Sequence, residues 1–132
     1  MTKLASVFIV DDNLHCLEFL TLAFQSHGGV EVSGEMKSVA ALGRIRDEKP
    51  DLVMLDIKMP DLDGFGLLSQ LRGESNPVPV VMCSGSARQK DVDRAYAGGC
   101  SGYVEKPATL EDYRSMAGAI LDYWRRGELP KH

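Results

Sequence analysis

Five polar residues of this 132-residue chain lie just after short apolar segments and have side chains suited to phosphoryl chemistry. They are Asp11, Asp12, Asp56, Ser84 and Lys106. Three carboxylates close together repel one another, by roughly 4 kcal/mol for a pair at 4 Å with an effective dielectric constant near 20. The lysine supplies one compensating charge, and a divalent cation would supply two more. Because the ligands are hard oxygens, Mg²⁺ is favoured over zinc, and it would also neutralise an incoming phosphoryl group.

The segments that must position these residues alternate between short apolar runs and longer amphipathic patterns. Near-continuous apolar runs favour strands that are covered on both faces of a parallel sheet. We expect strands at residues 7–10, 30–33, 52–55, 78–82 and 103–104. We expect helices at residues 13–27, 38–48, 63–72, 87–97 and 109–126. Strict alternation with right-handed crossovers predicts a doubly wound α/β fold, in which ligands bind at the carboxyl ends of the strands.

Local signals indicate where some of these helices begin and which side they bury. Ser38 is expected to cap the second helix, and Thr109 can cap the last. The last helix has a clear apolar stripe, which Trp124 is expected to complete. A role for Trp124 in dimerisation is the alternative.

The composition is that of an ordinary globular protein, with 44% hydrophobic and 26% charged residues. A net charge of −4 without a basic stripe argues against direct nucleic-acid binding. Three cysteines form no CxxC pair, and Cys83 is expected to be a buried free thiol. No apolar stretch is long enough to span a bilayer or has the flanks of a signal peptide. We therefore expect a cytoplasmic protein with one domain, residues 1–132, and no output domain.

Four short motifs make the sequence similar to the receiver-domain family of two-component response regulators, close to the single-domain chemotaxis type. They are Val10-Asp11-Asp12-Asn13, Leu55-Asp56-Ile57-Lys58-Met59-Pro60 with Asp63-Gly64, Cys83-Ser84-Gly85, and Tyr103-Val104-Glu105-Lys106-Pro107. The resemblance covers nearly the whole chain. It implies a flavodoxin-like receiver fold, with a five-stranded parallel sheet in the order 2-1-3-4-5 and five helices.

The resemblance also implies roles for the acidic residues. Asp56 would accept a phosphoryl group from a phosphohistidine on a sensor histidine kinase, with Mg²⁺ as the cofactor. Asp12 would bind the metal ion directly, Asp11 largely through water, and the backbone carbonyl of Lys58 would be a further ligand. The domain would not be a conventional enzyme, because it would catalyse only its own phosphorylation and dephosphorylation at Asp56.

The resemblance further implies how phosphorylation would change the structure. Ser84 and Lys106 would each contact a phosphoryl oxygen, and Tyr103 would swing inward as Ser84 moves. The surface formed by the fourth helix, fifth strand and fifth helix would then change for a downstream protein or for onward phosphotransfer. The Trp124 region with its Leu129-Pro130 tail suggests regulators of phytochrome-type kinases. The expected oligomeric state is a monomer or weak homodimer.

The chain departs from the family pattern in places. Ala108 replaces the usual Phe after the Lys106-Pro107 pair, whose peptide bond is cis in the family. Lys58 places a long cation two residues after the acceptor, and Ser86 lies two residues after Ser84. Our hypothesis is that Lys58 weakens Mg²⁺ binding slightly by repulsion and alters water access to the phosphoryl group.

Three other functions compete with this interpretation. A haloacid-dehalogenase phosphatase would need a second acid two residues after the acceptor, where this chain has Lys58. A flavodoxin-like electron carrier would need a Ser/Thr/Gly-rich phosphate loop after the first strand, where Asp11-Asp12-Asn13 would repel phosphate. A degenerate receiver that only binds proteins is disfavoured, because Asp56, Ser84 and Lys106 are all intact.

Overall fold

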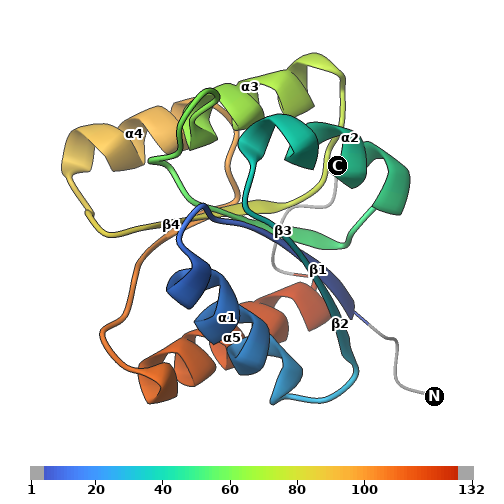
Figure 1. Ribbon diagram of the computed structural model, residues 1–132, viewed down its shortest axis with the longest axis vertical. Helices are drawn as coiled ribbons and strands as arrows, with labels where there is room; N and C mark the ends of the chain where they lie inside the picture. Colours follow the sequence, from blue (N-terminus) through green and yellow to red (C-terminus); the bar gives the residue numbers. More distant parts are fainter. Residues whose placement is uncertain (1–4, 128–132) are drawn as a thin grey trace.

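The computed structural model describes residues 5–127, which form a parallel sheet between two layers of helices (Figure 1). The strands are β1 (Ala5–Val10), β2 (Val30–Glu35), β3 (Leu52–Leu55), β4 (Val80–Ser84) and β5 (Gly102–Glu105). The helices are α1 (Leu14–Gln25), α2 (Ser38–Glu48), α3 (Gly64–Gly73), α4 (Gln89–Ala97) and α5 (Leu110–Arg125). The sheet order is β2-β1-β3-β4-β5 with every pair parallel, which confirms the expected fold.

The three central strands are apolar because the sheet is covered on both faces. Helices α1 and α5 pack on one face, and α2, α3 and α4 pack on the other (Figure 1). All four residues of β3 are buried, whereas the edge strands β2 and β5 are only partly buried. Trp124 is 5% exposed and belongs to the core under α5, so it completes the core-facing stripe as expected.

Capping residues fix the helices that begin near the carboxyl edge of the sheet. Asn13 caps α1 by accepting a hydrogen bond from the Cys16 amide, and Asp63 caps α3 by accepting one from the Gly66 amide. Thr109 caps α5 as expected. These side chains satisfy amides that have no partner within the helix. The turns after β1 and β3 are thereby held in place beside the strand ends.

One local expectation is wrong in the structure. Ser38 is the first residue of α2 and not its cap, because Lys37 occupies the capping position without a side-chain hydrogen bond. The Ser38 hydroxyl instead donates to the Pro60 carbonyl at 3.2 Å, which a sequence pattern of local spacing cannot reveal. The sequence left the isomer of the Lys106–Pro107 bond open, and every described peptide bond is trans.

Candidate functional site

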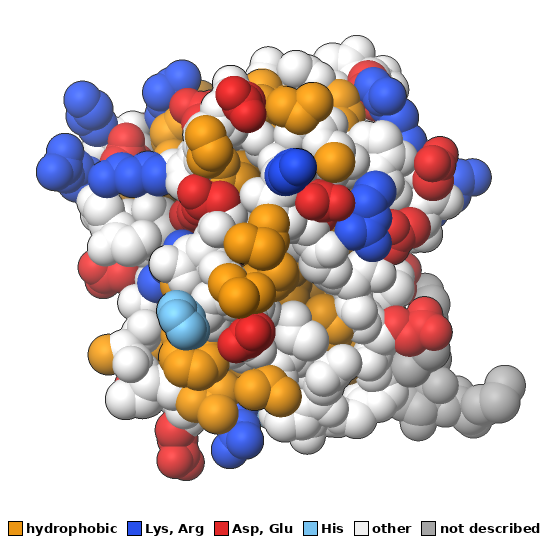
Figure 2. Space-filling model, in the orientation of Figure 1, with side chains coloured by type: hydrophobic (Ala, Val, Ile, Leu, Met, Phe, Trp, Pro, Cys, Tyr) orange, Lys and Arg blue, Asp and Glu red, His pale blue; other side chains and the backbone are white. Residues whose placement is uncertain are grey.

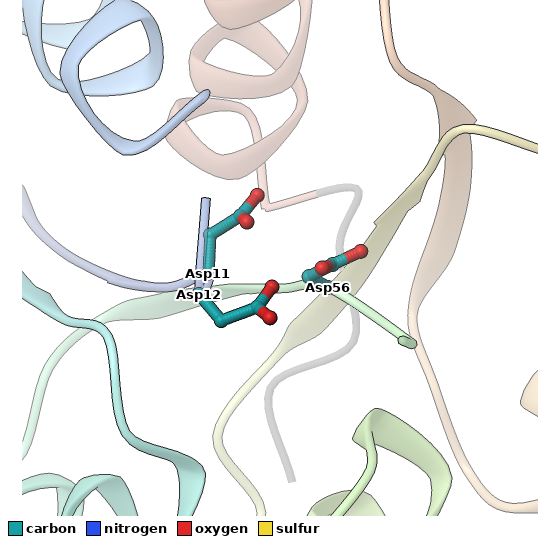
Figure 3. A group of neighbouring side chains, drawn as sticks. All are labelled: Asp11, Asp12 and Asp56. Atoms are coloured by element: carbon teal, nitrogen blue, oxygen red, sulfur yellow. The ribbon is translucent and has the colours of Figure 1, made fainter. Parts of the chain in front are cut away.

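The carboxylates of Asp11, Asp12 and Asp56 gather where β1 and β3 end (Figure 3). One ligand oxygen from each lies within 4.8 Å of the others, a spacing that suits a single metal ion. The strand ends are aligned by the sheet itself, because the Asp56 amide donates to the Val10 carbonyl at 3.0 Å. Parallel pairing thus brings together acids that are 44 and 45 positions apart in the chain.

Lys106 lies in the same pocket and supplies its positive charge. Its Nζ atom is 2.9 Å from Asp11 Oδ2 and 3.4 Å from Asp56 Oδ1. The turn after β5 is fixed to β4, since the Lys106 amide donates to the Ser84 carbonyl at 2.7 Å. One lysine against three acids leaves the site negative, so the pocket still attracts a cation.

The two carboxylate oxygens of Asp11 have different partners. Asp11 is 1% exposed, and its Oδ1 accepts the Asn13 amide at 2.9 Å. Its Oδ2 is fully buried and is close to Lys106, yet it receives no aligned hydrogen bond from any described residue. We therefore regard the Lys106 contact as an ion pair that leaves this oxygen able to bind a further ligand.

The site shifts the pKa of Asp56 and the pKa of Lys106. Burial, reinforced by the charge of Asp11, raises the pKa of the Asp56 carboxyl to about 6, although Lys106 opposes the shift. Burial works to lower the pKa of the Lys106 ammonium, but Asp11 and Asp56 outweigh it and raise that pKa. At neutral pH Asp56 is therefore mostly ionised and Lys106 is charged.

The donor set fits Mg²⁺. It consists of carboxylate oxygens, one of them buried without a hydrogen bond, and it includes no histidine or cysteine within the described cluster. The side chain of Lys58 is exposed, and its carbonyl accepts no hydrogen bond from residues 5–127. No hydrogen bond from these residues therefore occupies the carbonyl that the family resemblance implies as a further ligand.

Ser84 and Tyr103 lie on the neighbouring strands β4 and β5. Ser84 is 3% exposed, and its Oγ accepts the Ser86 amide at 3.3 Å. The Tyr103 hydroxyl donates to the Ser86 carbonyl at 2.6 Å, and the ring is partly buried against the core. The backbone of Ser86 thus joins the two side chains, a contact that the sequence analysis did not foresee because it involves main-chain atoms.

Gly64 is a further residue whose importance the sequence analysis missed. Its amide donates to the Ile57 carbonyl at 2.8 Å, and a Cβ atom placed on it would lie 2.3 Å from the Asp56 carbonyl oxygen. Only glycine permits this approach. The signal was present as the Asp63-Gly64 pair, but its physical reason is a tertiary contact.

Outside the pocket, the structure bears on three further features of the sequence. Cys83 is a buried free thiol, and burial raises its pKa to about 12. Within the described residues, no helix is both long and apolar enough to cross a bilayer. The Leu129-Pro130 tail lies outside the described residues.

Comparisons with known proteins agree with this geometry. The family model for the response regulator receiver domain matches residues 7–117. The probable transcriptional regulatory protein TcrX of Mycobacterium tuberculosis is 30% identical over 117 residues, which are 88% of this chain and 49% of that protein. The chain thus spans about half the length of this curated relative.

Two solved structures share the fold over almost their whole length. The phosphorylated cyanobacterial phytochrome response regulator RcpA is 25% identical with a TM-score of 0.84, covering 96% of this chain and 99% of that one. A CheY-like receiver domain protein from Methanospirillum hungatei is 25% identical with a TM-score of 0.79, covering 95% and 99%.

Proposed function

Because this chain belongs to the response regulator receiver domain family of two-component systems, we propose that it is a phosphorylation switch whose acceptor is Asp56. The observation that carries the proposal is the pocket in which Asp56 faces Asp11, Asp12 and Lys106. Receiver domains accept phosphoryl groups on an aspartate. Asp56 follows β3, which lies between β1 and β4 in the sheet, and it shares Lys106 with Asp11.

The proposed cofactor is Mg²⁺, held by Asp11, Asp12, Asp56 and the backbone carbonyl of Lys58. The fit rests on the oxygen donors and on the uncompensated negative charge of the pocket. When bound, the ion would neutralise phosphoryl oxygens during transfer. Asp11 is set back and buried, whereas Asp12 is exposed, which suits contact through water for the first and direct contact for the second.

The transfer itself uses the ionised carboxylate of Asp56 as nucleophile. A new P–O bond forms at an Asp56 oxygen while the P–N bond of the kinase phosphohistidine breaks, and the electron pair of that bond stays on the imidazole. With a pKa of about 6, Asp56 is mostly ionised at pH 7. Lys106 would move its ammonium from the carboxylate to a phosphoryl oxygen and so hold the new charge.

The resulting change would spread through Ser84 and Tyr103. At present the Ser84 hydroxyl accepts a hydrogen bond from the Ser86 amide. A phosphoryl group on Asp56 adds acceptor oxygens to which the same hydroxyl could donate instead. If Ser84 turns to donate to the phosphoryl group, the Ser86 backbone that also holds the Tyr103 hydroxyl must move. The surface of α4, β5 and α5 would then present a different shape to a downstream protein.

The kinase would dock beside the pocket on α1, which begins just after Asp12. Leu14, Phe19 and Leu22 on this helix are 50%, 37% and 50% exposed. Figure 2 shows hydrophobic side chains gathered over α1. An exposed apolar group next to a charged pocket suits a protein partner that must bring its histidine to Asp56.

We propose further that the protein is a cytoplasmic regulator, monomeric or weakly dimeric, without a nucleic-acid or membrane partner. A phytochrome-type sensor kinase is the suggested partner, supported by the likeness to RcpA. The output would be binding to another protein or onward phosphotransfer.

The test of the proposed function is labelling with acetyl phosphate and Mg²⁺, followed by phosphate-affinity electrophoresis. The parent should become labelled and Asp56→Asn should not, because an amide cannot accept the phosphoryl group. Asp122→Asn, an exposed acid on α5, is the matched control and should label normally. Equal labelling of parent and Asp56→Asn would refute the assignment, and no labelling of the parent would favour a degenerate receiver.

A further inference from the structure

Helix α4 is held in place by few contacts. Ala95 is its single buried residue, whereas α5 buries five. The residue before α4, Arg88, makes no side-chain capping hydrogen bond. An element with so little buried surface takes its position from a small number of individual contacts.

One of these contacts joins α4 to α3 by stacking a cation on an aromatic ring. The guanidinium carbon of Arg94 lies 4.1 Å from the centroid of the Phe65 ring, well within the range of a cation–π interaction. Phe65 is partly buried against the core, and Arg94 extends to it from an exposed position. No other polar or ring contact of the Arg94 side chain is found among the described residues.

Phe65 itself is fixed to the backbone of the proposed acceptor. The preceding residue, Gly64, donates to the Ile57 carbonyl at 2.8 Å and packs directly against the Asp56 carbonyl. Asp63 caps the same turn through the Gly66 amide at 2.8 Å. The first turn of α3 therefore cannot shift without the backbone of Asp56 and Ile57 shifting too.

We infer that the Phe65–Arg94 contact couples the acceptor segment to α4, by a connection separate from Ser84 and Tyr103. The inference rests on the proposed function, since it concerns how phosphorylation of Asp56 reaches the output surface. In the unphosphorylated protein the contact holds α4 against α3. A movement of α4 on phosphorylation has to break or stretch it, so the contact opposes activation. Phe65 and Arg94 are positioning residues and do not touch the phosphoryl group.

The test uses beryllofluoride with Mg²⁺ as a phosphoryl analogue, together with hydrogen exchange of residues 89–97. Arg94→Gln and Phe65→Leu should each speed exchange in α4 and tighten analogue binding, both by about two- to fivefold. The double variant should show no more than the larger single effect, because both changes remove the same contact. Thermal unfolding of each variant confirms that the fold is retained.

Two control variants separate the contact from a general effect of charge. Lys90→Gln removes a charge from the same helix and should leave both measurements at the parental values. Arg94→Lys keeps a cation at the same position and should restore most of the parental behaviour. If the parent binds the analogue while Arg94→Gln behaves like Lys90→Gln, or the single effects add in full, the coupling is refuted. If the parent binds no analogue at all, the proposed function fails and the inference fails with it.

Discussion

At the scale of single residues, burial and neighbouring charge distinguish Asp56 from the other two acids of the pocket by raising its pKa. Asp11 is the most buried, but a backbone amide and Lys106 both stabilise its charge. Asp12 is exposed to water. Asp56 is buried, and its one ion-pair contact, with Lys106, is longer, at 3.4 Å. Its ionised form is therefore the least stabilised of the three. A metal ion or a phosphoryl group on Asp56 would relieve that cost.

The raised pKa of Asp56 predicts a particular dependence of stability on pH in the metal-free protein. Between about pH 4 and pH 6 the folded state binds more protons at Asp56 than the unfolded state, so stability falls as the pH rises through this window. At pH 7 the ionised carboxylate costs about 2–3 kcal/mol. Asp56→Asn should therefore be more stable than the parent at pH 7 by about that amount, and by much less near pH 4.

Urea unfolding of both proteins with a chelator present, from pH 4 to pH 8, measures this difference. The comparison isolates Asp56, because other acids such as Glu35 and Glu74, whose hydrogen bonds lower their pKa, titrate in both proteins. A stability difference that is constant across the pH range would contradict the assigned environment of Asp56.

Lys106 should affect metal binding and phosphorylation in opposite directions. Lys106→Met removes a positive charge from the pocket, so Mg²⁺ should bind severalfold more tightly. The same change removes the group that would hold a phosphoryl oxygen, so labelling by acetyl phosphate at saturating Mg²⁺ should slow about tenfold or more. Lys90→Met is the control and should alter neither measurement. Weaker Mg²⁺ binding by Lys106→Met would show that the lysine supports the acids structurally rather than competing with the metal.

At the scale of elements, the site is most sensitive to changes in the turn that joins β3 to α3. The turn leaves Asp56, passes Lys58 and returns at Gly64 to pack on the Asp56 backbone. Asp63 caps the helix that follows. The Gly64–Ile57 hydrogen bond and the Asp63 cap together hold the start of α3 against the backbone of Asp56.

Gly64→Ala should therefore destabilise the protein by about 1–3 kcal/mol and impair Mg²⁺ binding, because its Cβ would lie 2.3 Å from the Asp56 carbonyl oxygen. Gly43→Ala, inside α2 with nothing within 4 Å of the added carbon, is the matched control. It should raise stability by about 0.5–1 kcal/mol through helix propensity. Thermal unfolding and a magnesium titration of both variants check the prediction, and equal effects of the two substitutions would disprove it.

At the scale of the whole molecule, the doubly wound sheet places charge at one edge and leaves the two faces to apolar packing. The acids and the lysine come from the ends of three strands that are distant in sequence, so they meet only in the folded state. A cation that needs all of them binds the native state and not the unfolded chain. Metal binding should then be linked to folding.

Mg²⁺ should accordingly raise the melting temperature, with a gain of about 2.7 kcal/mol when its free concentration is about 100 times Kd. The gain should disappear in Asp12→Asn and persist in Asp122→Asn, which keeps the pocket intact. Adding a chelator should reverse it. Thermal scans at several Mg²⁺ concentrations provide the measurement, and a melting temperature that does not respond in the parent would contradict the metal site.

The order of elements and the position of most functional side chains could be predicted from the sequence. Apolar runs marked the strands, because a strand buried on both faces needs continuous hydrophobic residues. Parallel strands end at one edge, so the polar residues that follow them had to meet there, and the structure places Asp11, Asp12, Asp56 and Lys106 together. Local chemistry sufficed where the cause was local, as for the Thr109 cap of the last helix.

Tertiary structure alone decided the contacts between segments that are far apart in the chain. Ser38 looks like a cap but bonds to Pro60, and Arg94 meets Phe65 across two helices. Burial and the nearby charge of Asp11 raise the pKa of Asp56, and Lys106, which lies nearer to Asp11 than to Asp56, opposes that shift. Spacing along the chain reports which face of an element a residue occupies, whereas the distance between two elements depends on the packing of everything that lies between them.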